Sequence, residues 1–325
     1  MMTCGQVMAA QGPVLDRVLD ATYRSVGAGL NRQAYGRLHA ARMKTAWGSR
    51  YQRAFALVDG ESILASAERY DLRGVFEGRA VRVCGIGSVW TKPSHQSLDR
   101  SRRLVDTIIE GAAREGAEMA LLFSPAGFDD DDRNEFQAVP LTDLTLRVTE
   151  SSRHGAPMTM VRGGEERDLA AIAAMGRVRA EHFRLHLDRD IEFIQYAITT
   201  KRLLAGLGSS NARQLHFFLA EEGITAAAYV VVSVAGGTWT LEECGDRDAS
   251  GARVGALLQA LIAREPVERR PTIHAWLPPR FLPPQVTIVS ATSSTAAIGV
   301  RMLGSGAMAP SLSAADVLFW RNDLL

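Results

Sequence analysis

The stretch from Val81 to Ser124 constrains the fold more than any other part of the chain. Residues 81–91 mix β-branched and small residues and predict a strand, on which Gly85 and Gly87 leave side-chain room or mark a bulge. A polar loop follows, and then a segment whose apolar residues recur at helical spacing. The stretch ends in a second predicted strand, residues 119–124. The order is therefore strand, polar loop, amphipathic helix, strand.

The rest of the first half predicts two helices, a meander of antiparallel strands that includes residues 81–91, and one last strand. The first hairpin turns at Asp59-Gly60, a pair typical of type I′ turns, and a second turn is expected at Glu77-Gly78. The expected helices are residues 13–25 and 32–47, and the further strands are 55–58, 62–70 and 141–148.

The second half repeats this order of elements. A mixed cluster of Gly, Pro, Ser and His in residues 151–164 predicts a connection. We therefore expect one domain over residues 1–150 and another over residues 151–325. The helices expected in the second half are 168–179 and 191–207, its strands are 215–220, 226–234 and 238–244, and a loop entering a third helix covers 245–266.

The loop after residues 81–91 resembles the central motif of the GCN5-related N-acetyltransferases (GNAT), which reads Arg or Gln, any two residues, Gly, any residue, then Gly or Ala. Here these six positions hold Gln96-Ser97-Leu98-Asp99-Arg100-Ser101. In the family, backbone N–H groups at the start of the helix hold the pyrophosphate of coenzyme A, and glycine permits its close approach. Asp99 and Ser101 depart from the glycines of this pattern.

The resemblance implies a fold, a co-substrate and a reaction. The fold is α/β (α+β), with a mixed, mostly antiparallel sheet flanked by helices, and two such GNAT-like domains stand in tandem. The co-substrate is acetyl-CoA, and the reaction is direct transfer of its acetyl group to a primary amine of a small molecule or peptide. The residues implied in coenzyme binding are Ser88, Val89, Trp90, Gln96, Ser97, Leu98, Asp99, Arg100 and Ser101.

The catalytic residues are not named by the sequence. The tandem arrangement is similar to the enhanced-intracellular-survival group of bacterial acetyltransferases, in which the terminal carboxylate serves as the base, and this resemblance implies Leu325 as a candidate for that role. The tyrosine acid that such enzymes carry after the second strand is replaced by Asp131 in this chain. The alternative is therefore a catalytically inactive GNAT-like binding or scaffold protein that has lost the loop glycines.

The loop of the second half matches the family pattern only at Gly251-Ala252. Two interpretations of this loop stay open: a second coenzyme site, or a helix capped by Asp248 or Ser250 with no ligand. Trp90 likewise has two roles open to it, because its ring can stack on a ligand or anchor the core.

Other chemistry is weaker. His182 and His186 lie four residues apart and would share a face of a helix, but the arginines between them favour an ion-paired surface over a metal site. The four aspartates at 129–132 lack the alternation of a calcium loop, so we expect no metal. Neither a Gly-x-Ser-x-Gly nor a Walker sequence occurs, which leaves hydrolases and nucleotide triphosphatases without their motifs.

Composition sets the remaining expectations. The chain has 325 residues, of which 46% are hydrophobic, and a formal net charge of +1. This balance favours neither nucleic acid nor a membrane surface as a partner. Three isolated cysteines fit a reducing compartment, and residues 1–11 lack the pattern of a signal peptide. We therefore expect a cytoplasmic protein, open to homo-oligomer formation.

Overall fold

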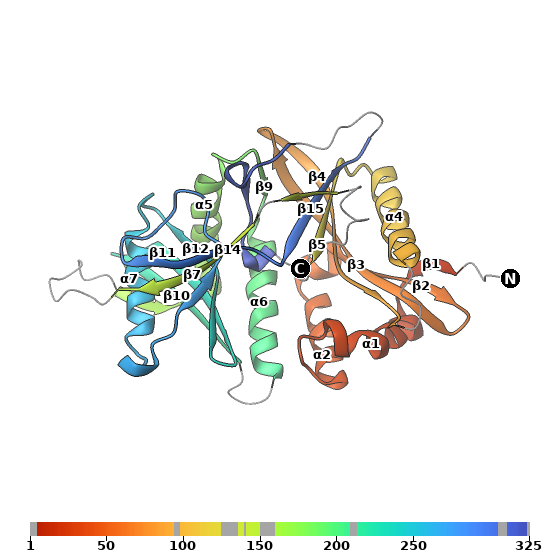
Figure 1. Ribbon diagram of the computed structural model, residues 1–325, viewed down its shortest axis with the longest axis horizontal. Helices are drawn as coiled ribbons and strands as arrows, with labels where there is room; N and C mark the ends of the chain where they lie inside the picture. The colour runs from red at the N-terminus through yellow and green to blue at the C-terminus, as the bar shows by residue number, and fades with distance from the viewer. Residues whose placement is uncertain are drawn as a thin grey trace. The chain divides into compact units, whose positions relative to one another are not determined.

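The computed structural model describes residues 5–93, 98–124, 136–139, 141–149, 160–208, 213–304 and 311–323, with the backbone alone for Leu98 and Asp99 (Figure 1). Its contacts divide the chain into two compact units. Unit 1 comprises Met1–Pro140, Thr295–Ser313 and Leu324–Leu325, and unit 2 comprises Leu141–Ser294 and Ala314–Asp323.

Unit 1 is built on a sheet with strand order β1-β2-β3-β4-β5-β15-β6. All neighbours in this order are antiparallel except β4 and β5, which run parallel. The strands are β1 (Gln6–Ala9), β2 (Gln52–Asp59), β3 (Ser62–Phe76), β4 (Arg79–Thr91), β5 (Met119–Ser124), β6 (Gln137–Val139) and β15 (Ala297–Met302).

Helices cover both faces of this sheet (Figure 1). One face packs against α4 (Leu98–Arg114), whose apolar side is buried with alternate residues of the strands, among them Ala65 and Ala67. The other face packs against α1 (Gly12–Val26), and there Ala56 and Val58 are buried with Trp90. Alternation along β2 and β3 thus divides the core between the two helix layers.

The predicted helix 32–47 is two helices. The first, α2 (Arg32–Met43), begins after Asn31, whose side chain accepts a hydrogen bond from the Ala34 N–H at 2.8 Å. The second, α3 (Ala46–Tyr51), begins after Thr45, whose hydroxyl accepts from the Gly48 N–H at 3.0 Å. A threonine that caps a helix has extended backbone and ends the preceding helical turn, so the single-helix prediction is wrong.

The two predicted hairpin turns are present, but the type I′ geometry expected at the first turn is found at the second. Between β2 and β3 the loop is Gly60 and Glu61, and of these only Gly60 has positive φ (57°). Between β3 and β4, Glu77 and Gly78 both have positive φ, at 50° and 72°. Type I′ turns need positive φ at both central residues, so that geometry belongs to the second hairpin.

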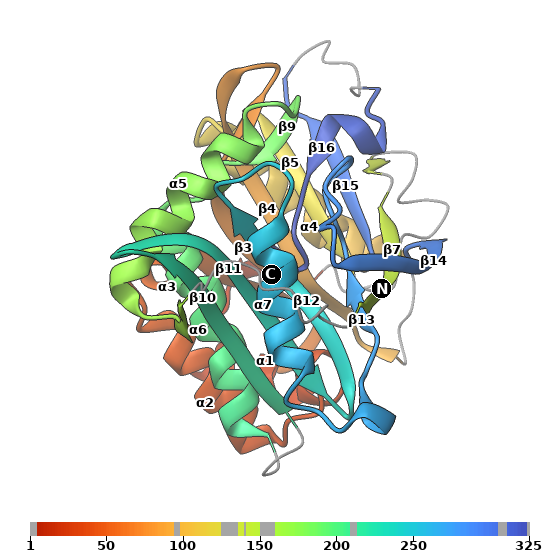
Figure 2. The ribbon, with the colours of Figure 1, turned by 90° about the vertical axis from the view of Figure 1, so that its left-hand side faces the viewer.

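Unit 2 has a sheet with strand order β14-β7-β13-β12-β11-β10-β8, in which only β12 and β13 are parallel (Figure 2). One face buries residues of α5 (Leu169–Ala180) and α6 (Ile191–Leu207), and the other buries α7 (Ala252–Ile262). The strands are β7 (Thr142–Val148), β8 (Met160–Gly163), β10 (Arg213–Glu222), β11 (Thr225–Ala235), β12 (Thr238–Asp246), β13 (Ile273–Ala275) and β14 (Val286–Ser293); β9 (Leu185–Leu187) and β16 (Val317–Leu318) pair with each other. The predicted α/β fold with mostly antiparallel sheets flanked by helices is confirmed.

Two strands lie in the sheet of the other half of the sequence. β7 follows the first half along the chain, yet it pairs with β13 and β14 of unit 2. β15 comes near the end of the chain, yet it lies between β5 and β6 of unit 1. A boundary at residue 150 would assign both strands by chain position, whereas the contacts begin unit 2 at Leu141 and return Thr295–Ser313 to unit 1.

The last described residues are held in unit 2 by a buried ionic cluster. The guanidinium of Arg189 pairs with Glu243 and, at 3.0 Å, with Asp323, and Asn322 donates to Glu243 at 2.7 Å. Burial raises the pKa of Asp323 to about 6, although Arg189 opposes this change, because two buried carboxylates share one cation. Leu325 lies outside the described residues.

The exchange of β15 gives a stability prediction. Ile298 on β15 is fully buried, whereas Ile288 on β14 is 47% exposed. We expect Ile298→Ala to lower the free energy of unfolding of unit 1 by about 2–4 kcal/mol, because it leaves a cavity beside β5, and Ile288→Ala to change it by less than about 0.5 kcal/mol. Hydrogen exchange of the β5 amides in the full chain measures the difference. Equal protection of β5 in the two variants would contradict the placement of β15.

Candidate functional site

Strand β4 carries a β-bulge at Ser88 and Val89. Glu68 of β3 pairs with Gly87 and Ser66 pairs with Trp90, so two residues of β4 lie opposite the single residue Ala67. Ser88 has φ of +51°, a conformation that few residues other than glycine adopt. The bulge therefore bends β4 at the residues that the sequence places in the coenzyme site.

Gly85, which precedes the bulge, has a packing role. A Cβ on Gly85 would lie 2.6 Å from a methyl carbon of Leu72 and 3.2 Å from the ring of Phe123. Of the two roles predicted for the glycines of this strand, side-chain room or a bulge, Gly85 has the first, because it leaves room for these side chains. The bulge itself follows Gly87.

β4 and β5 part just before the bulge. Their parallel pairing covers Val83–Ile86 on β4 and Met119–Leu122 on β5. β4 continues to Thr91, and within the described residues it makes no further pair with β5. On its other edge, β4 stays paired with β3 as far as Thr91. Backbone groups of β4 beyond Ile86 that face β5 are thus left without a strand partner, which suits an extended ligand with amide groups of its own.

The helix that follows supplies a second feature of this site. α4 begins at Leu98, so the N–H groups of its first turn come from the predicted pyrophosphate loop. Nη1 of Arg100 is buried and has no hydrogen-bond partner among the described residues. Gln96 and Ser97 lie outside the described residues.

The ring of Trp90 belongs to the core. Its side chain is 9% exposed and is buried with residues of β2 and α1. The structure therefore favours the core anchor over a ring that stacks on a ligand. The backbone of Trp90 still lies at the end of the bulge.

A buried polar network lies beside the bulge, and sequence reasoning missed it. The carboxylate of Glu68 pairs with Arg42 at 3.2 Å and lies 3.5 Å from Nδ1 of His39. The hydroxyl of Tyr70 donates to the same carboxylate and accepts from Arg42 at 3.0 Å. His39 and Arg42 are three apart on α2, and Glu68 and Tyr70 are two apart on β3, so each pair shares a face; this spacing was the available signal.

Glu68 is ionised within this network. Burial by itself raises the pKa of Glu68. Arg42, His39 and the Tyr70 hydroxyl together have a larger, opposite effect, so the pKa of this carboxyl lies well below its usual range. The carboxylate is therefore a fixed charge, balanced by the guanidinium. It lies on the α1 side of the sheet, opposite to α4, because Ser66 and Trp90 share that face.

Unit 2 repeats the opening of the sheet. Val231 pairs with Glu243 and Val232 pairs with Leu241, so Glu242 is an extra residue on β12. The parallel pairing of β12 with β13 ends at Leu241, although β12 continues to Asp246. The two units therefore share a bulged strand that leaves its parallel neighbour and leads to a helix.

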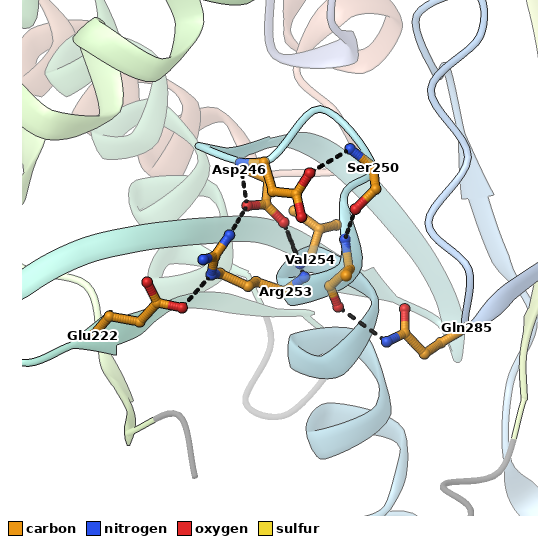
Figure 3. Close-up of polar contacts among 8 residues, drawn as sticks. Glu222, Asp246, Ser250, Arg253, Val254 and Gln285 are labelled. Atoms are coloured by element: carbon orange, nitrogen blue, oxygen red, sulfur yellow. Dashed lines mark hydrogen bonds and ion pairs between the residues drawn. The ribbon is translucent and has the colours of Figure 1, made fainter. Parts of the chain in front are cut away.

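The helix start in unit 2 is occupied by side chains (Figure 3). One oxygen of Asp246 accepts from the N–H groups of Arg253 and Val254, at 2.9 and 3.2 Å. The hydroxyl of Ser250 accepts from the Ala252 N–H at 3.3 Å, and Asp248 accepts from the Ser250 N–H at 3.0 Å. The structure favours the capped helix over a second coenzyme site, because a carboxylate already uses the donors that an anion would need.

The negative charge of this capping carboxylate is also balanced by a neighbouring cation. The guanidinium of Arg253 lies 3.2 Å from Asp246 and 2.6 Å from Glu222 (Figure 3). The charge of Asp246 is therefore compensated from its own helix. Asp246, the main capping residue, was not predicted; its position at the end of a strand just before a loop was the signal.

The weaker alternatives lose support. α5 ends at Ala180 and His186 lies on β9, so His182 and His186 do not share a helix. Within the described ranges, no group of His, Cys, Asp and Glu side chains could hold a metal ion. The aspartates at 129–132, including Asp131, lie outside these ranges. Of the helices described, none is long and apolar enough to cross a membrane.

Comparison with known proteins agrees with the predicted resemblance. Residues 21–128 match the family model of an acetyltransferase (GNAT) domain. No curated protein matches the sequence. The fold is similar to that of a GCN5-related N-acetyltransferase from Kribbella flavida, with a TM-score of 0.66 and 18% identity over 93% of this chain and 72% of the other.

Two further solved structures have this fold. A conserved protein of unknown function from Enterococcus faecalis, described as a probable N-acyltransferase, has a TM-score of 0.63 and 11% identity, over 92% of this chain and 73% of its own. Eis1 from Mycobacterium abscessus has a TM-score of 0.56 and 13% identity, over 91% and 73%. The predicted resemblance to GCN5-related N-acetyltransferases is confirmed, in sequence over residues 21–128 and in fold over most of the chain.

The network beside the bulge predicts a pH dependence of stability. Glu68→Gln leaves Arg42 without its charge partner, and we expect it to destabilise the chain by about 3 kcal/mol at neutral pH. Because the pKa of Glu68 is lower in the folded state than its ordinary value of 4.5, the unfolded state binds more protons below that pH, and the natural chain loses stability as the solution is acidified. The variant lacks this loss, so the gap between the two narrows below about pH 4.5.

Urea unfolding at a series of pH values measures this gap. Glu110→Gln on the exposed side of α4 is the matched control, and we expect it to follow the natural chain at every pH. A gap that stays constant on acidification would show that Glu68 is not held ionised.

Proposed function

We propose that this chain, which resembles the GCN5-related N-acetyltransferases in sequence over residues 21–128 and in fold over most of its length, transfers the acetyl group of acetyl-CoA to a primary amine. One observation carries the proposal: β4 leaves β5 at a bulge that falls at Ser88 and Val89, inside the matched segment. The acceptor is an amine of a small molecule or a peptide in the cytoplasm.

In this proposal unit 1 holds the coenzyme. The pantetheine arm lies along β4, where its amide groups pair with the backbone of Ser88, Val89 and Trp90 in place of a strand. The pyrophosphate lies at the start of α4, at the N–H groups of residues 96–101, where Arg100, whose Nη1 has no hydrogen-bond partner among the described residues, supplies a cation. Unit 2 has no coenzyme in this scheme, because Asp246 uses the corresponding donors of α7.

The reaction then follows from the thioester. The neutral amine nitrogen attacks the carbonyl carbon, a C–N bond forms, the C–S bond breaks, and coenzyme A leaves with its sulfur carrying the electron pair. The proton lost by the amine ends on that sulfur or in solvent through a base. Backbone N–H groups at the bulge stabilise the oxyanion that forms on the carbonyl oxygen. The acceptor approaches on the α1 side of the sheet, where the network of Glu68 lies.

A second candidate is a non-catalytic GNAT-like binding or scaffold protein. Asp99 favours it, because a carboxylate in the first turn of α4 repels a pyrophosphate. The two candidates differ in whether the natural chain binds acetyl-CoA.

Calorimetric titration with acetyl-CoA separates these candidates. We expect the natural chain to bind one molecule per chain, and Asp99→Gly/Ser101→Ala to bind about fivefold more tightly, the equivalent of about 1 kcal/mol of removed repulsion. Binding by the double variant alone would favour the scaffold. No binding by either chain would overturn the proposed function, and two molecules per chain would contradict the assignment of unit 2.

A matched pair of variants at Ser88 tests the bulge. Ser88→Gly keeps the positive φ without strain, so we expect affinity for acetyl-CoA to stay within about twofold. Ser88→Val disfavours that φ by about 1–2 kcal/mol, so the bulge straightens and affinity falls about tenfold. Titration of both variants, with thermal unfolding to verify the fold, measures the difference. Equal affinities would show that the bulge does not position the coenzyme.

A further inference from the structure

Unit 2 contains a cavity that the proposed acetyl transfer does not use. It has a volume of about 620 Å³ and lies between α5, the loop after β12 and residues 278–281. Its apolar wall includes Met175, Val178 and Phe183. The volume is within the range of about 300–1,000 Å³ that is usual for small-molecule sites.

Arg179 is the most informative residue of this cavity. Its guanidinium lies over the ring of Phe281, 3.8 Å from the centroid. Its Nε is buried and has no hydrogen-bond partner within the described residues, and none of the carboxylates described there forms an ion pair with it. Burial lowers the pKa of Arg179, but a guanidinium keeps its charge in proteins. A cation that is largely withdrawn from water thus has no carboxylate in ion-pair contact among the described residues, and Asp246 acts on it only from a greater distance.

The charge of the whole cavity has the same sign. Arg247 and Arg280 also line it, and the one carboxylate on the wall is Asp246. That carboxylate is already neutralised, because it accepts the N–H groups of α7 and pairs with Arg253. Three arginines thus face one compensated acid.

The backbone of Arg280 is a further sign of a built site. It has φ of +65°, which costs a residue other than glycine about 1 kcal/mol. Strain of this kind persists where the surrounding structure holds it, frequently beside a ligand. The residue is one position before Phe281, the ring under Arg179.

We propose that this cavity binds an organic carboxylate with an apolar body. The carboxylate pairs with Arg179 and with the arginines at the rim, and the apolar body lies against Met175, Val178 and Phe183. A guanidinium fork suits the two oxygens of a carboxylate. A phosphate or pyrophosphate fits less well, because the helix N–H groups that would hold it are already used by Asp246. The proposal concerns unit 2 alone and does not depend on acetyl transfer.

Ligand-observed NMR titration of the full chain tests the proposal with three probes of equal chain length: octanoate, 1-octanol and octylamine. We expect octanoate to bind at least tenfold more tightly than octanol, and octylamine not to bind. Arg179→Met keeps the length and apolar surface of the side chain but removes its charge, and we expect a loss of at least tenfold in octanoate affinity. Arg179→Lys keeps the charge but loses the fork, and we expect its affinity to lie between those of the natural chain and Arg179→Met.

The matched control is Arg264→Met. Arg264 lies over the ring of Phe218, 4.8 Å from the centroid, and does not line the cavity. We expect this variant to bind octanoate as the natural chain does, with thermal unfolding verifying that both variants fold. Saturation with acetyl-CoA should leave octanoate in place.

Four results would overturn the proposal. They are no binding of octanoate at millimolar concentration, equal binding of octanol and octanoate, unchanged affinity in Arg179→Met, and displacement of octanoate by acetyl-CoA. The first three do not bear on whether unit 1 binds the coenzyme, because acetyl-CoA binding is measured in a separate titration. The fourth would mean that octanoate and acetyl-CoA compete for one site, whereas failure of the proposed function is shown by the absence of acetyl-CoA binding.

Discussion

Pairing between β4 and β5 reaches only as far as Ile86 and Leu122, and the proposed chemistry depends on that limit. The gap stays open because each strand is held on its other edge: β4 by β3 as far as Thr91, and β5 by β15 as far as Ser124. The bulge at Ser88 turns β4 away without breaking its pairs with β3. The backbone groups of β4 beyond Ile86 that face β5 therefore have no strand partner and are open to hydrogen bonds with a ligand.

In both units a bulged strand parts from its parallel neighbour and leads to a helix, but the start of that helix differs between the units. In unit 1 the first turn of the helix after the bulged strand contains Arg100, one nitrogen of which has no partner in the part of the chain that the structure describes. In unit 2 the N–H groups of the corresponding helix bind a carboxylate supplied by the preceding strand. A carboxylate at a helix start thus uses the N–H groups that an anion would need, while the fold stays intact. The cavity beside α5 belongs to unit 2, and its arginines favour a smaller anion.

Local sequence pattern was enough to predict many helices and strands, but not which strands pair with one another. The helix 191–207 and the strand 119–124 have the predicted bounds. Length separated the two, because a run of 17 residues is typical of a helix and a short apolar run of six is typical of a buried strand. Residues 142–148 form the expected strand, but which sheet it joins depends on contacts with residues more than a hundred positions later, which no local pattern encodes. The roles of Glu68 and Asp246 were not predicted for the same reason, because each depends on residues distant in the sequence or on backbone groups that the fold brings close. The proposed coenzyme residues were found only through resemblance.

The position of β15 in the sequence has a consequence for synthesis. The ribosome makes β5 long before it makes residues 297–302, so the nascent first half emerges with one edge of its sheet uncovered. That edge is the apolar segment MALLFS, which is able to pair with strands of other chains. Completion of unit 1 must therefore wait until residues 297–302 have left the ribosome. If the chain were divided between the two halves of its sequence, the first half would lack β15 and the second half would lack β7.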